Sequence, residues 1–93
     1  MKVVFELLAL FRQKAGTGRL ELELPAAPTV LAALRAAEGA LGGQALLQGE
    51  RLREGVLVFL KEPRGATRRV FQPAEERVES GQALVLSTAM AGG

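Results

Sequence analysis

The chain has 93 residues, enough for one domain, and 48% of them are hydrophobic, which supports a folded core and excludes a disordered segment. The net charge is only +2, Trp and Tyr are absent, and no apolar run is long enough for a membrane span, so neither nucleic-acid nor membrane binding is expected. The chain also lacks His and Cys, and with them the commonest proton shuttle, thiol nucleophile and soft metal ligands, so no metal site is expected.

The first segment, residues 2–11, is predicted to be a strand. Alternate residues would share one face of it: Val3, Phe5, Leu7, Ala9 and Phe11. Apolar residues also occupy part of the opposite face, which is typical of a central strand covered on both sides. No small-residue cleavage site follows, so a signal peptide is not expected and the cytoplasm is the expected location.

A turn at residues 16–18 leads to a second predicted strand and then to a helix. Leucines alternate with charged residues over 19–24, which predicts a half-exposed strand paired with the first. Thr29 is a candidate helix cap, and Gly42-Gly43 marks the end of the helix. Apolar residues recur at helical spacing at Val30, Leu31, Leu34, Ala37 and Leu41, whereas Arg35 and Glu38 are expected to face outward.

The rest of the chain is predicted to be mainly strands. Residues 44–55 are interpreted as polar connections, and 56–60 as a buried strand because of their β-branched and aromatic content. A short returning strand is expected over 67–71, and a last strand over 83–88.

Two groups of side chains are candidates for surface contacts. The four phenylalanines, Phe5, Phe11, Phe59 and Phe71, are expected in the core, and any exposed one would mark a partner interface. Three arginines, Arg64, Arg68 and Arg69, form a basic patch near a turn. The patch is interpreted first as solvated charge and second as a contact for an acidic face of a partner enzyme.

The element order predicts an α+β fold. A hairpin, one main helix packed on one face of a mixed sheet, and then further strands form a roll like the ubiquitin-like β-grasp. In that fold the first and last strands lie adjacent and parallel at the centre of the sheet. Residues 1–93 are therefore expected to form a single β-grasp domain with a flexible C-terminal tail from about residue 88. The rigid body would serve as a handle for the tail.

Three segments resemble the MoaD-like small subunit of molybdopterin synthase, a member of the MoaD/ThiS sulfur-carrier family. These are the first strand running into Phe11-Arg12, the helix start Pro28-Thr29-Val30, and the final turn and strand that precede Gly92-Gly93. The resemblance implies that Gly93 is adenylated and converted to a thiocarboxylate. It also implies that Gly92, Ala91 and Met90 pass through a channel of the partner, since the two glycines carry no Cβ and keep the tail thin.

The resemblance further implies which partners supply the chemistry. An ubiquitin-activating-like adenylyltransferase would use MgATP to activate the tail, and the large subunit of molybdopterin synthase would receive the sulfur, possibly in a heterotetramer of two small and two large subunits. The chain itself would bind no cofactor and would not be an enzyme on its own. It would be the sulfur-donating subunit in molybdenum cofactor biosynthesis.

Other functions stay open beside this one. Where the family often has a proline pair before the diglycine, this chain has Ser87-Thr88-Ala89-Met90-Ala91, which is similar to ThiS-like carriers for thiamin and to carriers for tRNA thiolation. A ubiquitin-like modifier would instead join Gly93 to lysines of other proteins. A β-grasp interaction module would use no tail chemistry at all.

Overall fold

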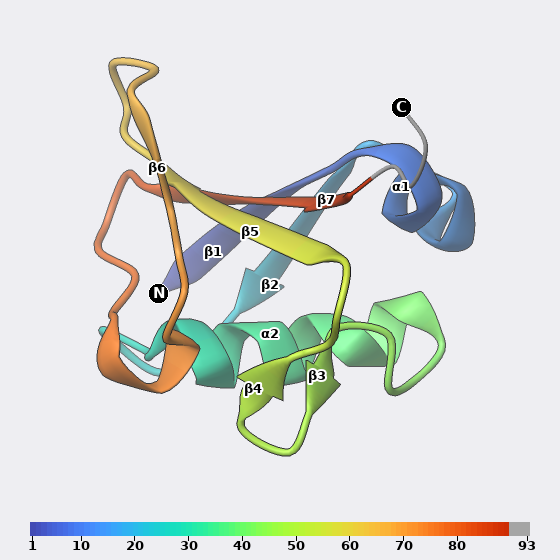
Figure 1. Ribbon diagram of the computed structural model, residues 1–93. Coiled ribbons are helices and arrows are strands. Elements are labelled where there is room, and N and C mark those ends of the chain that lie inside the picture. The colour runs from blue at the N-terminus through green and yellow to red at the C-terminus, as the bar shows by residue number, and fades with distance from the viewer. Residues whose placement is uncertain (90–93) are drawn as a thin grey trace.

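Five strands form one mixed sheet in the computed structural model, which describes residues 1–89 (Figure 1). The strands are β1 (Lys2–Leu7), β2 (Arg19–Glu23), β5 (Val56–Lys61), β6 (Thr67–Arg69) and β7 (Ala83–Thr88), and a separate small hairpin consists of β3 (Leu47–Gln48) and β4 (Arg51–Leu52). The helices are α1 (Ala9–Ala15) and α2 (Val30–Glu38), with short 3-10 turns η1 (Gly39–Leu41) and η2 (Pro73–Glu75).

The sheet is built around β7, in the strand order β2-β1-β7-β5-β6. β1 and β7 run parallel, with Phe5 opposite Leu84 and Leu7 opposite Leu86. The pairs β1–β2, β5–β7 and β5–β6 are antiparallel. The sheet lies on one side of α2, as Figure 1 shows. These features confirm the predicted α+β class, with a mixed sheet, one main helix on one face and a parallel central pair.

The core lies between the sheet and α2. Strand residues two apart point to the same face, so one set of alternating side chains is buried in each central strand. The core residues of the strands are Val3, Phe5 and Leu7 in β1, Val56, Val58 and Leu60 in β5, and Leu84 and Leu86 in β7. Val85 is buried on the opposite face of β7. The buried residues of α2 are Val30, Leu31, Ala33, Leu34 and Ala37. The helical spacing seen in the sequence therefore gives the buried stripe of α2.

α2 begins where the sequence predicts and changes geometry before its predicted end. Thr29 is the N-cap, and its Oγ1 accepts a hydrogen bond from the Ala32 amide at 3.0 Å. The α-helix stops at Glu38, and the chain continues through η1 to Gly42, where φ is 87°. This left-handed conformation is strained for residues with a Cβ, so a glycine suits the stop.

The predicted first strand is wrong beyond Leu7. The Leu8 amide donates to the Leu86 carbonyl at 2.9 Å, Ala9 turns the chain with φ 53°, and α1 follows. Its sequence, ALFRQKA, is rich in good helix formers, and Gly16 ends it in a left-handed conformation. Phe11 still reaches the core, but from a helix and not from the alternation of a strand.

Two further predictions need correction. Residues 44–55 are not only connections, because they contain the β3–β4 hairpin. The returning strand ends at Arg69, after which Val70 is buried and donates its amide to the Val58 carbonyl. Phe71, the next residue, therefore points outward and is 67% exposed, contrary to its expected place in the core. The guanidinium of Arg69 lies 4.7 Å from the centre of its ring.

Replacing the α2 cap tests how much the helix start contributes. Thr29→Ala removes the acceptor for the Ala32 amide and is expected to lower the free energy of unfolding by about 1 kcal/mol. Thr29→Ser keeps a hydroxyl acceptor and is the matched control. Urea denaturation followed by circular dichroism measures both, and equal stability of the two variants would contradict the role of the cap.

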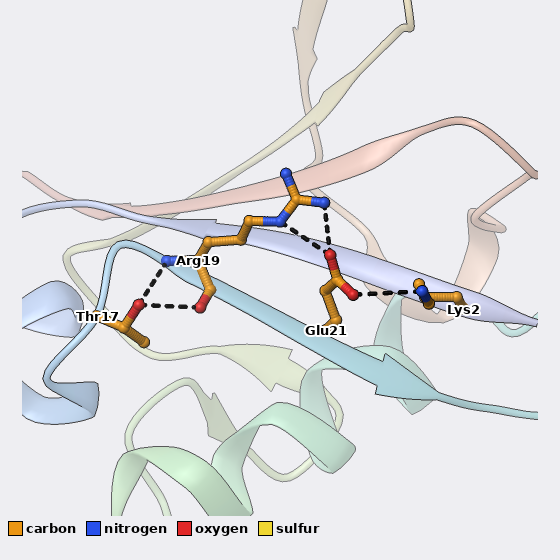
Figure 2. Close-up of polar contacts among 4 residues, drawn as sticks. All are labelled: Lys2, Thr17, Arg19 and Glu21. Carbon is orange, nitrogen blue, oxygen red and sulfur yellow. Dashed lines mark hydrogen bonds and ion pairs between the residues drawn. The ribbon is translucent and has the colours of Figure 1, made fainter.

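Charged side chains surround Glu21 on the exposed face of the edge strand β2 (Figure 2). Its Oε2 accepts from Arg19 Nε at 3.0 Å, and its Oε1 lies 3.4 Å from Lys2 Nζ. The hydrogen bond from Arg19, and then the one from Lys2, favour the ionised carboxylate and hold the pKa of Glu21 below its ordinary value.

The lowered pKa predicts a pH-dependent contribution to stability. A carboxylate that is more acidic in the folded state stabilises the fold above the pKa of the unfolded chain, and this contribution is lost as the pH falls through the lower folded pKa. Wild type is therefore expected to be more stable than Glu21→Gln at neutral pH, with the difference shrinking in acid. Denaturant titrations across this range measure it, and Glu50→Gln serves as an exposed control. A difference that does not change with pH would contradict the prediction.

Candidate functional site at the root of the tail

The residues predicted to react or to enter a partner channel, Met90, Ala91, Gly92 and Gly93, lie outside the described residues. The structure does place the segment from which they continue. β7 ends at Thr88, and the next amide, that of Ala89, donates to the Gly55 carbonyl at 2.7 Å. The chain is thus hydrogen-bonded to the body up to four residues before Gly93.

β7 is the central strand of the sheet. It pairs with β1 on one side and with β5 on the other, and the register with β5 runs from Ala83 opposite Lys61 to Thr88 opposite Val56. Leu84 and Leu86 are fully buried beneath it. We define the end of this strand, Thr88 and Ala89, as the tail root, and its position is fixed by the two neighbouring strands and the core.

α1 lies against β7 beside the tail root (Figure 1). Phe11 anchors the helix in the core, with only 2% of its surface exposed. Two neighbours project outward instead: Leu8 is 45% exposed and Leu10 is 48% exposed. Because the turn at Leu8-Ala9 breaks the strand pattern, these leucines lie on the surface and not on the second covered face of the predicted strand.

A hollow of about 280 Å³ adjoins the tail root, and we call it the root hollow. Its apolar lining residues include Leu10, Phe11, Ala45 and Val56, and its charged ones are Lys14, Arg53 and Glu54. Thr88 and Ala89 line the same hollow, so the last described residues lie at its edge. Sequence reasoning did not find this site, because it is formed by α1, the loop before β5 and the end of β7, which are distant in the sequence.

The loop that supplies one wall of the root hollow is fixed by Glu38. Its Oε2 accepts hydrogen bonds from the Leu46 amide at 3.0 Å and the Leu47 amide at 2.9 Å. The expectation that Glu38 simply faces outward is therefore wrong: its carboxylate accepts hydrogen bonds from two backbone amides after the helix. The neighbouring Ala45 lines the root hollow.

The basic patch predicted near the β5–β6 turn lies away from the tail root (Figure 1). Arg68 forms an ion pair with Glu76, and Arg69 covers the ring of Phe71. Two of its three arginines are thus engaged within the molecule, which agrees with the first interpretation of the patch as surface charge.

Within residues 1–89, no three His, Cys, Asp or Glu side chains gather in a way that could hold a metal ion. The same part of the chain has no helix that is both long and apolar enough to cross a membrane. What the described residues provide is a rigid strand end with an apolar and charged hollow beside it.

No family model matches this sequence, and no curated protein matches it. Several solved structures do match the fold. Small archaeal modifier protein 1 (SAMP1) from Haloferax volcanii aligns over 100% of both chains, with a TM-score of 0.77 and 21% identity. A Pyrococcus furiosus protein assigned as molybdopterin converting factor subunit 1 aligns over 97% of this chain and 99% of its own, with a TM-score of 0.71 and 22% identity. The BexX/CysO complex from Amycolatopsis orientalis gives a TM-score of 0.66 at 24% identity, with 98% of this chain and 99% of the other covered.

These likenesses establish the fold as the ubiquitin-like β-grasp, as predicted. The predicted resemblance to MoaD-like proteins is confirmed at the level of the fold, since a molybdopterin converting factor subunit is among the structures that match.

Two neighbouring residues of α1 are expected to differ sharply in their effect on stability. Phe11→Ala removes a buried ring and is expected to lower the free energy of unfolding by about 3–5 kcal/mol. Leu10→Ala, at a half-exposed position, is expected to change it by no more than about 0.5 kcal/mol. Denaturant titration of both variants tests the assignment, and a large loss at Leu10 would show that this side chain belongs to the core.

Proposed function

We propose that this chain is a ubiquitin-like sulfur carrier whose reacting group is the carboxylate of Gly93. One structural observation carries the proposal. The central strand β7 leads directly to the last residues, and the Ala89 amide is still bonded to the body four residues before Gly93. A fixed strand end followed by a short segment that finishes in two small glycines suits delivery into a narrow channel. The small modifier and converting-factor proteins of the same fold support this reading.

The chemistry is divided between the carrier and its partners. A carboxylate is a poor acyl donor, so a Gly93 oxygen attacks the α-phosphorus of MgATP in an ubiquitin-activating-like adenylyltransferase, and pyrophosphate leaves. A sulfur donor then displaces AMP from the acyl-adenylate and leaves a thiocarboxylate on Gly93. The described residues contribute positioning, and the partner contributes MgATP and catalysis. The chain is therefore not proposed to be an enzyme on its own.

For the recipient of the sulfur we propose the molybdopterin pathway, with this chain as the small subunit of a molybdopterin synthase. The segments around Phe11, Thr29 and Gly92-Gly93 support this assignment, as does the Pyrococcus neighbour. The large synthase subunit is then the second partner, in a heterotetramer. The chain itself is proposed to bind no metal or cofactor.

Two alternatives keep the same reacting carboxylate. The residues Ser87 to Ala91 favour a carrier for thiamin or tRNA thiolation. The name of SAMP1 favours a protein modifier, in which the activated Gly93 carbonyl is attacked by a lysine amine and forms an isopeptide bond. All three recipients require the same activation of Gly93, so the activation step is tested first.

Intact-mass spectrometry tests the activation step. The full chain is incubated with the ubiquitin-activating-like adenylyltransferase of the same organism, MgATP and a sulfide source. The expected result is a mass gain that matches one oxygen replaced by sulfur, and a chain lacking Gly93 is the control and should not change. An unchanged mass together with no adenylate on the wild-type chain would reject the carrier and favour the interaction module.

A further inference from the structure

We propose that the root hollow and the two exposed leucines beside it form a docking surface for the enzyme that activates the tail. The segment that binds there is inferred to present an apolar side chain flanked by carboxylates. This inference rests on the proposed function and adds the chemistry of the partner surface.

Some large hydrophobic side chains remain exposed in the fold. Among residues 1–89 these are Leu8, Leu10 and Phe71. The Arg69 guanidinium lies over one face of the Phe71 ring, whereas Leu10 lines the root hollow with Phe11. Leu8 lies at the turn before α1, where its amide is bonded to β7. Exposed leucines gathered next to an apolar hollow mark an interaction site more often than isolated ones do.

Two cationic side chains, Lys14 and Arg53, line the root hollow. Neither takes part in an ion pair within the described part of the chain. Arg53 Nε is buried and has no acceptor, and one of its terminal nitrogens, Nη2, makes only a 3.5 Å contact with Gln44 Oε1. Arg53 as a whole is only partly buried, so a carboxylate of a partner could pair with the accessible part of this guanidinium, which has few acceptors within the described residues. Glu54 is the single acidic residue in the lining.

The tail is short, so an enzyme that binds Gly93 must also lie close to the root hollow. Four residues follow Ala89 up to Gly93, and even fully extended they span at most ~14 Å. An active site that holds the Gly93 carboxylate therefore brings its walls within this distance of Ala89. Because Thr88 and Ala89 line the root hollow, the surface around the enzyme's channel faces the hollow and its cations.

Steady-state adenylation kinetics test the surface in the full chain. Lys14→Glu and Leu10→Glu are expected to raise the KM for the carrier roughly tenfold with little change in kcat, because they weaken binding and leave the reacting tail intact. Arg64→Glu and Phe71→Ala are matched controls at the other end of the molecule and are expected to keep the wild-type KM within about twofold. Thermal melting confirms that each variant is folded.

The outcomes separate this inference from the proposed function. If wild type is activated and the two hollow variants keep its KM, the docking surface is wrong and the carrier function stands. An increase in KM for the hollow variants and the control variants alike would also overturn the inference, since it would show a general effect of charge or surface change.

A second measurement does not depend on activation. A ¹⁵N-labelled chain is titrated with a short acetylated peptide that contains one leucine between glutamates, and with a matched peptide that has lysines in their place. The acidic peptide is expected to shift the signals of Leu10, Lys14, Thr88 and the Arg53 Nε–H, and Lys14→Glu is expected to reduce these shifts. Equal shifts with the lysine peptide, or no shifts at the hollow, would overturn the proposed surface chemistry even if the wild-type chain were never adenylated.

Discussion

The parallel pairing of β1 and β7 is the constraint on which the rest of the molecule depends. It places segments from the two ends of the chain side by side in the middle of the sheet. The other strands of the sheet therefore pair on the outer sides of β1 and β7. Parallel neighbours require a long connection, and the segment between β1 and β7 includes α2, which covers the apolar face of both strands. The same pairing holds the turn after Leu7, since the Leu8 amide bonds to Leu86. α1 is therefore fixed next to the strand end that leads to the tail.

Much of the fold could be predicted because its signals are local. The alternation around Leu22, the cap at Thr29 and the buried runs of β5 and β7 each specify an element from a few adjacent residues. The prediction for residues 8–11 was wrong because apolar side chains there fit a strand pattern as well as a short helix. The competing signal was the helix-forming composition up to Ala15, ended by Gly16, and the hydrogen bond to β7 favours the helix.

The candidate site also has one part that could be predicted from the sequence and one part that could not. The tail glycines can be picked out from the sequence by composition alone, although they lie outside the described residues. The root hollow could not be predicted, because Lys14, Ala45 and Arg53 meet only after α1 has formed and Glu38 has bound the loop amides. Sequence periodicity predicts local elements and does not reveal contacts between residues that are far apart in the chain. A glutamate on a helix face also looks solvent-exposed until the loop that it caps is known.

The position of β7 between two partners also determines how the molecule bears a mechanical load. Force applied along the chain beyond Thr88 would run along the strand axis, whereas the hydrogen bonds to β5 lie across it and those to β1 are slanted. The two ladders would then share the load in shear, and they would not open one bond at a time as a peeled edge strand does. A protein machine that grips this end and pulls would therefore meet its strongest resistance at the first strand it encounters.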